Sequence, residues 1–159
     1  MPRNGGLSLD GSSRVSDNRR VRVQWLGEYR TQIDVRGVHQ IQGDETPEYG
    51  GADTGPMPTE LLLAALGSCM CLAVAHVARK RRMEIAALSV DVAAEKDMAA
   101  FRFCEIALLV RADLPQDSLD PLVAQARRYC FVSNTLSEGC TITYTAVSTA
   151  GASAGGSST

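Results

Sequence analysis

The feature that most constrains this chain is an uncharged, apolar run from Leu61 to Val77, which a basic cluster follows at residues 79–82. A membrane span needs about 20 apolar residues, so the run nearly has that length. However, it contains Gly67, Ser68, two cysteines and many alanines, and the segments on both sides alternate like strands of a soluble domain. We therefore expect no membrane span, and predict a helix buried in a protein core or at a dimer interface.

The two cysteines of this run, Cys69 and Cys71, raise the possibility of a metal site. Successive residues of a helix turn by about 100°, so these thiols project to nearly opposite sides and cannot chelate one ion together. His76 returns to the face of Cys69, but a lone histidine on an apolar face is more often a core residue than a ligand. We expect no metal and no cofactor. Whether one thiol is reactive stays open, because reactivity requires a cation or helix dipole nearby, which periodicity does not reveal.

Composition narrows the class of protein. The 159 residues, 45% of them hydrophobic, suit one globular domain, and a net charge of -2 leaves no electrostatic footprint for nucleic acid. The N-terminus lacks the basic and apolar pattern of an export signal, so we expect a cytoplasmic protein. Five cysteines without CxxC spacing indicate free or catalytic thiols in a reducing compartment.

The order of strand and helix patterns predicts an α+β fold. Gly- and Ser-rich ends at residues 1–18 and 149–159 are predicted to be disordered, which leaves one domain at 19–148. We expect one helix from Pro58 to near Met83, and a second within 117–130, where Asp120 and Pro121 are the plausible cap and first-turn residues. The predicted strands lie at 21–27, 31–42 with a break at a glycine, 87–96, 101–113 and 141–147, and a long loop lies at 43–58.

Two motifs, GGADTGPMPTELLLAALGSC and then CFVSNTL, resemble those of the OsmC/Ohr family, the osmotically inducible and organic hydroperoxide resistance proteins. The resemblance covers Val21 to Val147 and is nearer to the general OsmC-like branch. It implies an OsmC-like fold, in which antiparallel sheets pack on long central helices in an intertwined homodimer. It also implies a cysteine-based peroxidase that reduces organic hydroperoxides to alcohols as a defence against oxidative stress.

The same resemblance implies roles for individual residues. Cys69 corresponds to the peroxidatic cysteine, Cys130 to the resolving cysteine, and Arg36 to an arginine that activates the thiolate. An external dithiol, in the family often a lipoyl protein, would reopen the disulfide. The family's hydroperoxide-specialised branch has a glutamate ten residues before the peroxidatic cysteine, where this chain has Thr59. Glu60 lies nine residues before and points to the opposite side of the helix, so it is either a catalytic residue or a cap at the helix N-terminus.

One further departure from the motif is Phe131, where the family has proline; its ring could narrow the pocket or change the local turn. The face of Cys69 also carries Leu62, Leu66 and Ala73, which we expect to form an apolar pocket. The register of Glu60 motivates an alternative function, that of a non-catalytic OsmC-like protein that binds a small apolar ligand in the dimer cleft.

Overall fold

A computed structural model of the chain describes residues 20–148. The predictions of disorder at 1–18 and 149–159 therefore lie outside the described residues. The chain forms two compact units, and the division between them falls between Leu63 and Ala64.

The first unit is built on a three-stranded antiparallel sheet in the order β1-β2-β3. Its register pairs Val23 with Ile33 and Ile33 with Ile41, so these apolar residues of the three strands lie on one face. Three residues, 36–38, join β2 to β3, and the turn is closed by a hydrogen bond from the Val38 N–H to Val35 O. Its two central residues, Arg36 and Gly37, have positive φ, 61° and 69°, as in a type I′ turn. The strands are β1 (Val21–Gly27), β2 (Arg30–Val35) and β3 (His39–Gly43).

A long loop, which contains the short 3-10 helix η1 (Pro47–Tyr49), follows the sheet. Its organising residue is Asp44, whose side chain is buried and accepts hydrogen bonds from the backbone N–H groups of Glu45, Ala52 and Thr54 and from the Thr54 hydroxyl, at 2.8–3.2 Å. These bonds, led by that from the Thr54 backbone, outweigh the effect of burial and lower the pKa of Asp44 to about 2. The predicted loop is therefore ordered around one ionised carboxylate.

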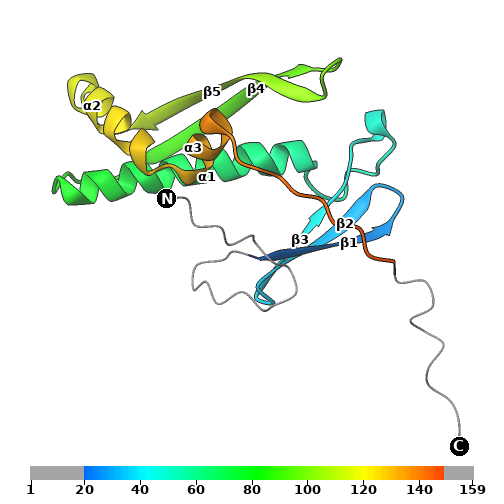
Figure 1. The fold of residues 1–159 in the computed structure, drawn as a ribbon. Helices are drawn as coiled ribbons and strands as arrows, with labels where there is room; N and C mark the ends of the chain where they lie inside the picture. Colours follow the sequence, from blue (N-terminus) through cyan, green and yellow to red (C-terminus); the bar gives the residue numbers. More distant parts are fainter. Residues whose placement is uncertain (1–19, 149–159) are drawn as a thin grey trace, which may run out of the picture. The chain divides into compact units, whose positions relative to one another are not determined.

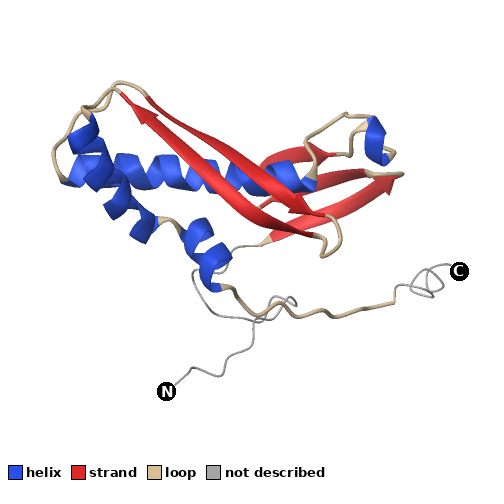
Figure 2. Cartoon of the chain, turned by 90° about the horizontal axis from the view of Figure 1, so that it is seen from above, coloured by secondary structure: helices blue, strands red, loops and turns tan. Residues whose placement is uncertain are grey.

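The second unit places a two-stranded antiparallel hairpin and two short helices around most of α1 (Figures 1 and 2). Buried residues recur on α1 at helical spacing, at Leu66, Met70, Ala73, Val74 and Val77, and join the core with residues from the hairpin and from α2. Apolar burial along this stripe is what holds the unit together. The elements are α1 (Pro58–Lys80), which begins in the first unit, β4 (Leu88–Asp97), β5 (Arg102–Ala112), α2 (Gln116–Ala126), the 3-10 helix η2 (Arg127–Tyr129) and α3 (Phe131–Glu138).

One of the small residues of α1, Gly67, lies where the helix packs closely against β4. A Cβ added at Gly67 would lie 3.0 Å from Val92 Cγ2 on β4, so glycine lets the strand approach the helix. By length and composition α1 is also apolar enough to cross a membrane, as the core helix of a soluble protein can be, and 39% of its apolar window is buried within the chain. Its remaining surface exposes large apolar side chains, of which Leu72 is 69% exposed.

The helix α1 ends slightly earlier than predicted, at Lys80 instead of near Met83. Arg82 adopts a positive φ of 58°, its N–H donates to Arg79 O, and the N–H of Met83 donates to Ala78 O. This pair of bonds is the Schellman arrangement that closes a helix C-terminus. Met83 then packs against the core, which directs the chain back towards β4.

Two predictions of secondary structure are wrong. The second helix, α2, begins at Gln116, so Asp120 is not its cap and Pro121 lies inside it. A proline there removes one backbone bond, at a cost of about 3 kcal/mol, which the burial of Leu119 and Leu122 offsets. Residues 141–147, predicted as a strand, form none, because alternation alone does not supply the neighbouring backbone that a strand must pair with.

Candidate functional site

Two thiols, Cys69 of α1 and Cys130 at the start of α3, lie together in the core of the second unit. Cys130 is completely buried, and Cys69 is partly buried and packs against the cluster to which Cys130 belongs. Burial raises the pKa of Cys130, and a hydrogen bond with the Cys69 thiol and the charge of Cys69 raise it further. Cys130 is thus fully buried with a raised pKa, whereas Cys69 is partly buried, which gives the two sulfur atoms unequal surroundings.

Cys130 also serves as the N-cap of α3. Its backbone is extended, with φ -86° and ψ 97°, and its Sγ accepts a hydrogen bond of 3.4 Å from the backbone N–H of Ser133. A thiol in this position replaces the Ser, Thr or Asp that usually caps a helix. The Ser133 N–H opposes the effect of burial on the pKa of Cys130 and would stabilise a thiolate formed there.

The segment that carries Cys130 is attached to α1 by the ring of Tyr129. This ring meets the His76 ring edge-on, with centroids 5.2 Å apart, and lies 4.9 Å from the Lys80 ammonium. Aromatic pairs and cation–π contacts are each worth about 0.5–1.5 kcal/mol. The clamp therefore holds Cys130 next to the helix that carries Cys69.

The ring of Phe131 does not crowd the thiol within the described chain. Phe131 is the first residue of α3 and is 84% exposed. Proline is favoured at this first helical position because the N–H there has no helical partner. The helix keeps its cap with phenylalanine in place of proline.

The other three cysteines have different surroundings from this pair. Cys104 is exposed on β5 and its thiol donates to Glu95 O at 3.4 Å, while Cys140 is exposed after α3 and Cys71 is partly buried on α1. Among residues 20–148, no group of three or more His, Cys, Asp or Glu side chains is arranged to hold a metal ion.

Glu60, one of the predicted site residues, has its carboxylate engaged at the helix N-terminus. Its Oε2 accepts a hydrogen bond of 2.8 Å from the backbone N–H of Met57, the residue before α1 begins. This is the reciprocal half of a capping box, as the capping alternative predicts. A catalytic role for Glu60 would require its carboxylate to give up this hydrogen bond and to bind another group. That role stays a prediction.

Arg36, the predicted activating arginine, lies at the exposed tip of the β2–β3 hairpin in the first unit. The turn is held by Asp34, whose Oδ1 accepts a bond of 2.7 Å from the Gly37 N–H, and by the bond from the Val38 N–H to Val35 O. The role of Arg36 towards Cys69 stays a prediction, since the two residues belong to different compact units.

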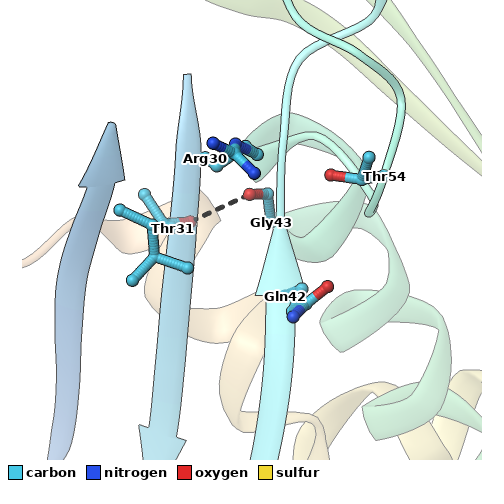
Figure 3. A pocket seen from close by; sticks show the side chains of 6 residues that line it. Arg30, Thr31, Gln42, Gly43 and Thr54 are labelled. Carbon is cyan, nitrogen blue, oxygen red and sulfur yellow. Dashed lines mark hydrogen bonds between the residues drawn. The ribbon is translucent and has the colours of Figure 1, made fainter. Parts of the chain in front are cut away.

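A shallow hollow of about 150 Å³ in the first unit is lined by a second arginine, Arg30, at the start of β2. Figure 3 shows Arg30 and Thr54 on two sides of its opening, and Thr31, whose hydroxyl donates to Gly43 O, on its wall. Sequence reasoning missed Arg30, although it also precedes the Gly-rich loop in an early strand. Arg30 is thus a second candidate for the guanidinium. The lining is completed by Leu26 and Gln42.

The expected apolar pocket on the Cys69 face is largely filled within the chain. Leu66 and Ala73 are 3% and 5% exposed and belong to the same core cluster as Cys130. Leu62 is 38% exposed and remains available to a ligand or to another chain.

Comparison with known proteins gives consistent matches over most of the chain. The family model described as OsmC-like protein matches residues 50–145. An uncharacterized protein of Methanocaldococcus jannaschii is 24% identical over 127 residues, which cover 76% of this chain and 64% of that protein, so the chain spans less than two thirds of this relative.

Solved structures show the same fold. An OsmC-like protein of Mycoplasma pneumoniae superposes with a TM-score of 0.68 at 17% identity, covering 77% of this chain and 89% of that chain. An organic hydroperoxide resistance protein of Legionella pneumophila gives a TM-score of 0.65 at 20% identity, covering 77% and 91%. The organic hydroperoxide resistance protein OhrB of Bacillus subtilis gives 0.56 at 26% identity, covering 74% and 89%. The predicted α+β class and antiparallel sheets are confirmed.

Proposed function

Because this chain belongs to the OsmC-like protein family, we propose that it is a thiol-dependent peroxidase that reduces organic hydroperoxides to alcohols. The observation that carries the proposal is the pairing of Cys69 with the buried Cys130 in one core. Such a pair suits a reaction in which one thiol is oxidised and the other condenses with it. The name of the Bacillus subtilis structure, at 26% identity, supports the same substrate class.

The proposed reaction begins at the more accessible thiol. The Cys69 thiolate attacks the terminal oxygen of the hydroperoxide, the O–O bond breaks, and the alkoxide leaves and takes up a proton to become the alcohol. Cys69 is then a sulfenic acid. The Cys130 sulfur attacks it, water leaves, and a Cys69–Cys130 disulfide forms. An external dithiol returns two electrons and two protons by thiol–disulfide exchange, so each cycle converts one hydroperoxide and one dithiol into an alcohol, water and a disulfide.

The unequal environments of the two thiols fit these roles. Cys130 is fully buried, caps α3 and has a raised pKa, as suits a resolving thiol that reacts second. Cys69 is partly exposed, as suits the thiol that meets the substrate. Five free thiols also suit a reducing, cytoplasmic compartment, which we propose as the location of the protein.

We also propose that the protein works as a homodimer. The second unit leaves Leu72 exposed on α1, and the segment 141–147 exposes alternate apolar side chains without a strand partner. A second copy would cover apolar surface of this kind. Sedimentation equilibrium should give twice the monomer mass, and a monomer at micromolar concentration would contradict the proposal.

The test of the activity is dithiol-dependent consumption of cumene hydroperoxide. Cys69→Ser should abolish it, Cys130→Ser should leave a single turnover with a sulfenate that dimedone traps at Cys69, and the control Cys71→Ser should retain it. Organic hydroperoxides should react faster than hydrogen peroxide. Consumption that persists in Cys69→Ser would show the assignment to be wrong.

The two candidate arginines are separated by the same assay. The variant that lacks the activating guanidinium should lose about 100-fold or more in the rate of Cys69 oxidation, since preorganised charge of this kind contributes that order of magnitude. Arg36→Gln and Arg30→Gln are compared at equal protein stability. The prediction from the resemblance favours Arg36, and the hollow favours Arg30.

One observation favours a second function, that of a non-catalytic protein that binds a small apolar ligand. The Glu60 carboxylate is committed to the Met57 N–H and is not free to orient an arginine. In that case the purified protein should carry a ligand, and its thiols should react with hydroperoxide no faster than free cysteine.

A further inference from the structure

Six basic residues form an exposed patch in the second unit, at the C-terminal end of α1 and on η2. They amount to six of the chain's 16 Lys and Arg residues, although the whole chain has a net charge of -2. We call this set the cationic patch. It consists of Arg79, Lys80, Arg81, Arg82, Arg127 and Arg128.

The two parts of the cationic patch are brought together by the Tyr129 clamp. The Lys80 ammonium lies 4.9 Å from the Tyr129 ring centroid, and Arg127 and Arg128 directly precede this ring. Figure 1 shows α2, which leads into η2, beside the same end of α1. The patch therefore unites residues that are far apart in the sequence.

Helix dipoles account for only part of this charge. The C-terminus of a helix carries about half a negative charge, so two helix ends offset about one of the six positive charges. Within residues 20–148, none of the six forms an ion pair with an acidic side chain. The remaining charge is presented to solvent and attracts an anionic partner.

The cationic patch adjoins the thiol pair. Arg128 is two residues before Cys130, and its carbonyl accepts a hydrogen bond of 3.5 Å from the Asn134 side chain of α3. Lys80 is eleven residues after Cys69 on α1, which corresponds to about 16 Å along the helix axis. A protein that covers the patch must therefore span about this distance to reach Cys69 from Lys80.

We propose that the cationic patch docks an acidic protein that carries the dithiol reductant of the Cys69–Cys130 disulfide. This inference rests on the proposed function, since it concerns the reductant of that same site. A protein suits the patch better than a small anion does, because its charges are spread over two exposed elements, whereas small-molecule sites are concave. Complementary charge of this kind raises the rate of encounter.

The different burial of the two cysteines determines which sulfur of the disulfide the partner attacks. The first partner thiolate attacks the Sγ of Cys69, which is partly exposed, and the S–S bond breaks. Cys130 leaves as a thiolate that accepts the Ser133 N–H bond and then takes up a proton. The second partner thiol attacks the mixed disulfide and releases Cys69, so the partner becomes a disulfide and gives two electrons to this chain.

The test uses three synthetic dithiol peptides with one Cys-Gly-Pro-Cys core, flanked by four Glu, four Gln or four Lys residues. The full-length protein is oxidised with diamide, so that the test does not depend on peroxidase activity. Each rate of reduction is divided by the rate of the same peptide with hydroxyethyl disulfide, which corrects for thiol reactivity. We expect the Glu peptide to be about tenfold faster than the Gln peptide at 20 mM salt, and the advantage to fall to about twofold at 500 mM.

A pair of matched variants locates the effect. Arg79→Gln with Arg128→Gln removes one charge from each part of the cationic patch, and should lower the advantage of the Glu peptide about threefold at 20 mM salt. Lys96→Gln with Arg102→Gln removes the same charge near the β4–β5 turn and should leave the advantage unchanged. Reduction by the Gln peptide should be equal in both variants, which shows that the disulfide itself is intact.

Three results would overturn the proposal. One is equal corrected rates for the three peptides at 20 mM salt, and another is equal losses in the two variants. The third is that a 20-base-pair DNA duplex binds to the patch at 150 mM salt while the Glu peptide has no advantage over the Gln peptide. That result would mean that the patch binds nucleic acid. If diamide forms the disulfide but hydroperoxide does not, the proposed function fails while the docking test still gives its own answer.

Discussion

The raised pKa of Cys130 predicts how its attack on a neighbouring sulfur depends on pH. The perturbation is a change of pH from 6.5 to 8.5, with Cys69 converted to a mixed disulfide with thionitrobenzoate. This electrophile does not titrate in that range, so the rate at which Cys130 expels thionitrobenzoate reports the thiolate fraction of Cys130 alone.

The magnitude follows from the burial of the thiol. Cys130 is 0% exposed, and burial is the largest cause that raises its pKa above the ordinary value of 9.0. Modification of Cys69 removes the charge of that neighbour but leaves the burial. The thiolate then stays the minor form of Cys130 and its fraction rises about tenfold per pH unit, so the rate should rise about 100-fold from pH 6.5 to 8.5.

The assay follows the release of the second equivalent of thionitrobenzoate at 412 nm by stopped flow. A protein with Cys71, Cys104 and Cys140 replaced by Ser keeps only the pair of interest. In the matched control, which adds Cys130→Ser, the first equivalent should be released and the second retained.

Two results would refute the reasoning. A rate that levels off below pH 8 would mean that Cys130 ionises more readily than a buried thiol should. A second equivalent that is released equally slowly with and without Cys130 would mean that the two sulfur atoms are not neighbours.

Three further predictions concern stability and are measured as free energies of unfolding in urea. Asp44→Asn should destabilise the protein at pH 7. The folded pKa of Asp44 is about 2, below its ordinary 3.8, so the stabilisation by the ionised carboxylate is present above pH 4 and is lost as the pH falls through 2. The free energies of unfolding of the variant and the wild type should therefore converge near pH 2. Gly51→Ala should cost about 1–3 kcal/mol, because its Cβ would lie 1.9 Å from Glu45 O, and an unchanged midpoint would contradict the loop geometry. Phe131→Pro should add about 0.4–1 kcal/mol, since proline suits the first position of a helix, and a loss would mean that the exposed ring packs elsewhere.

The sequence predicted the elements whose own pattern determines them. The alternation around Val23 and Ile33 and the uncharged apolar run of α1 are local signals, and these strands and this helix are confirmed. The OsmC-like family and the α+β class are confirmed as well. Signals that depend on a distant partner were less informative, as the missing strand at 141–147 shows.

Parts of the site could not be predicted, because they depend on contacts between elements. The cap that Cys130 makes on α3 uses a residue type that is not a usual cap, and the Tyr129 clamp joins residues from two elements. The bond between the Glu60 carboxylate and the Met57 N–H agrees with the capping alternative that the sequence left open. The pairing of Cys69 with Cys130 came from the family resemblance, and the structure places both in one core.

The central claim is that Cys69 and Cys130 form one redox pair. Its most direct test is peptide mapping by mass spectrometry after the reduced protein has reacted with one equivalent of cumene hydroperoxide. The account predicts a Cys69–Cys130 disulfide in most chains, with Cys71 and Cys104 still alkylated as free thiols. Oxidation confined to Cys104 or Cys140, or no disulfide at all, would contradict it.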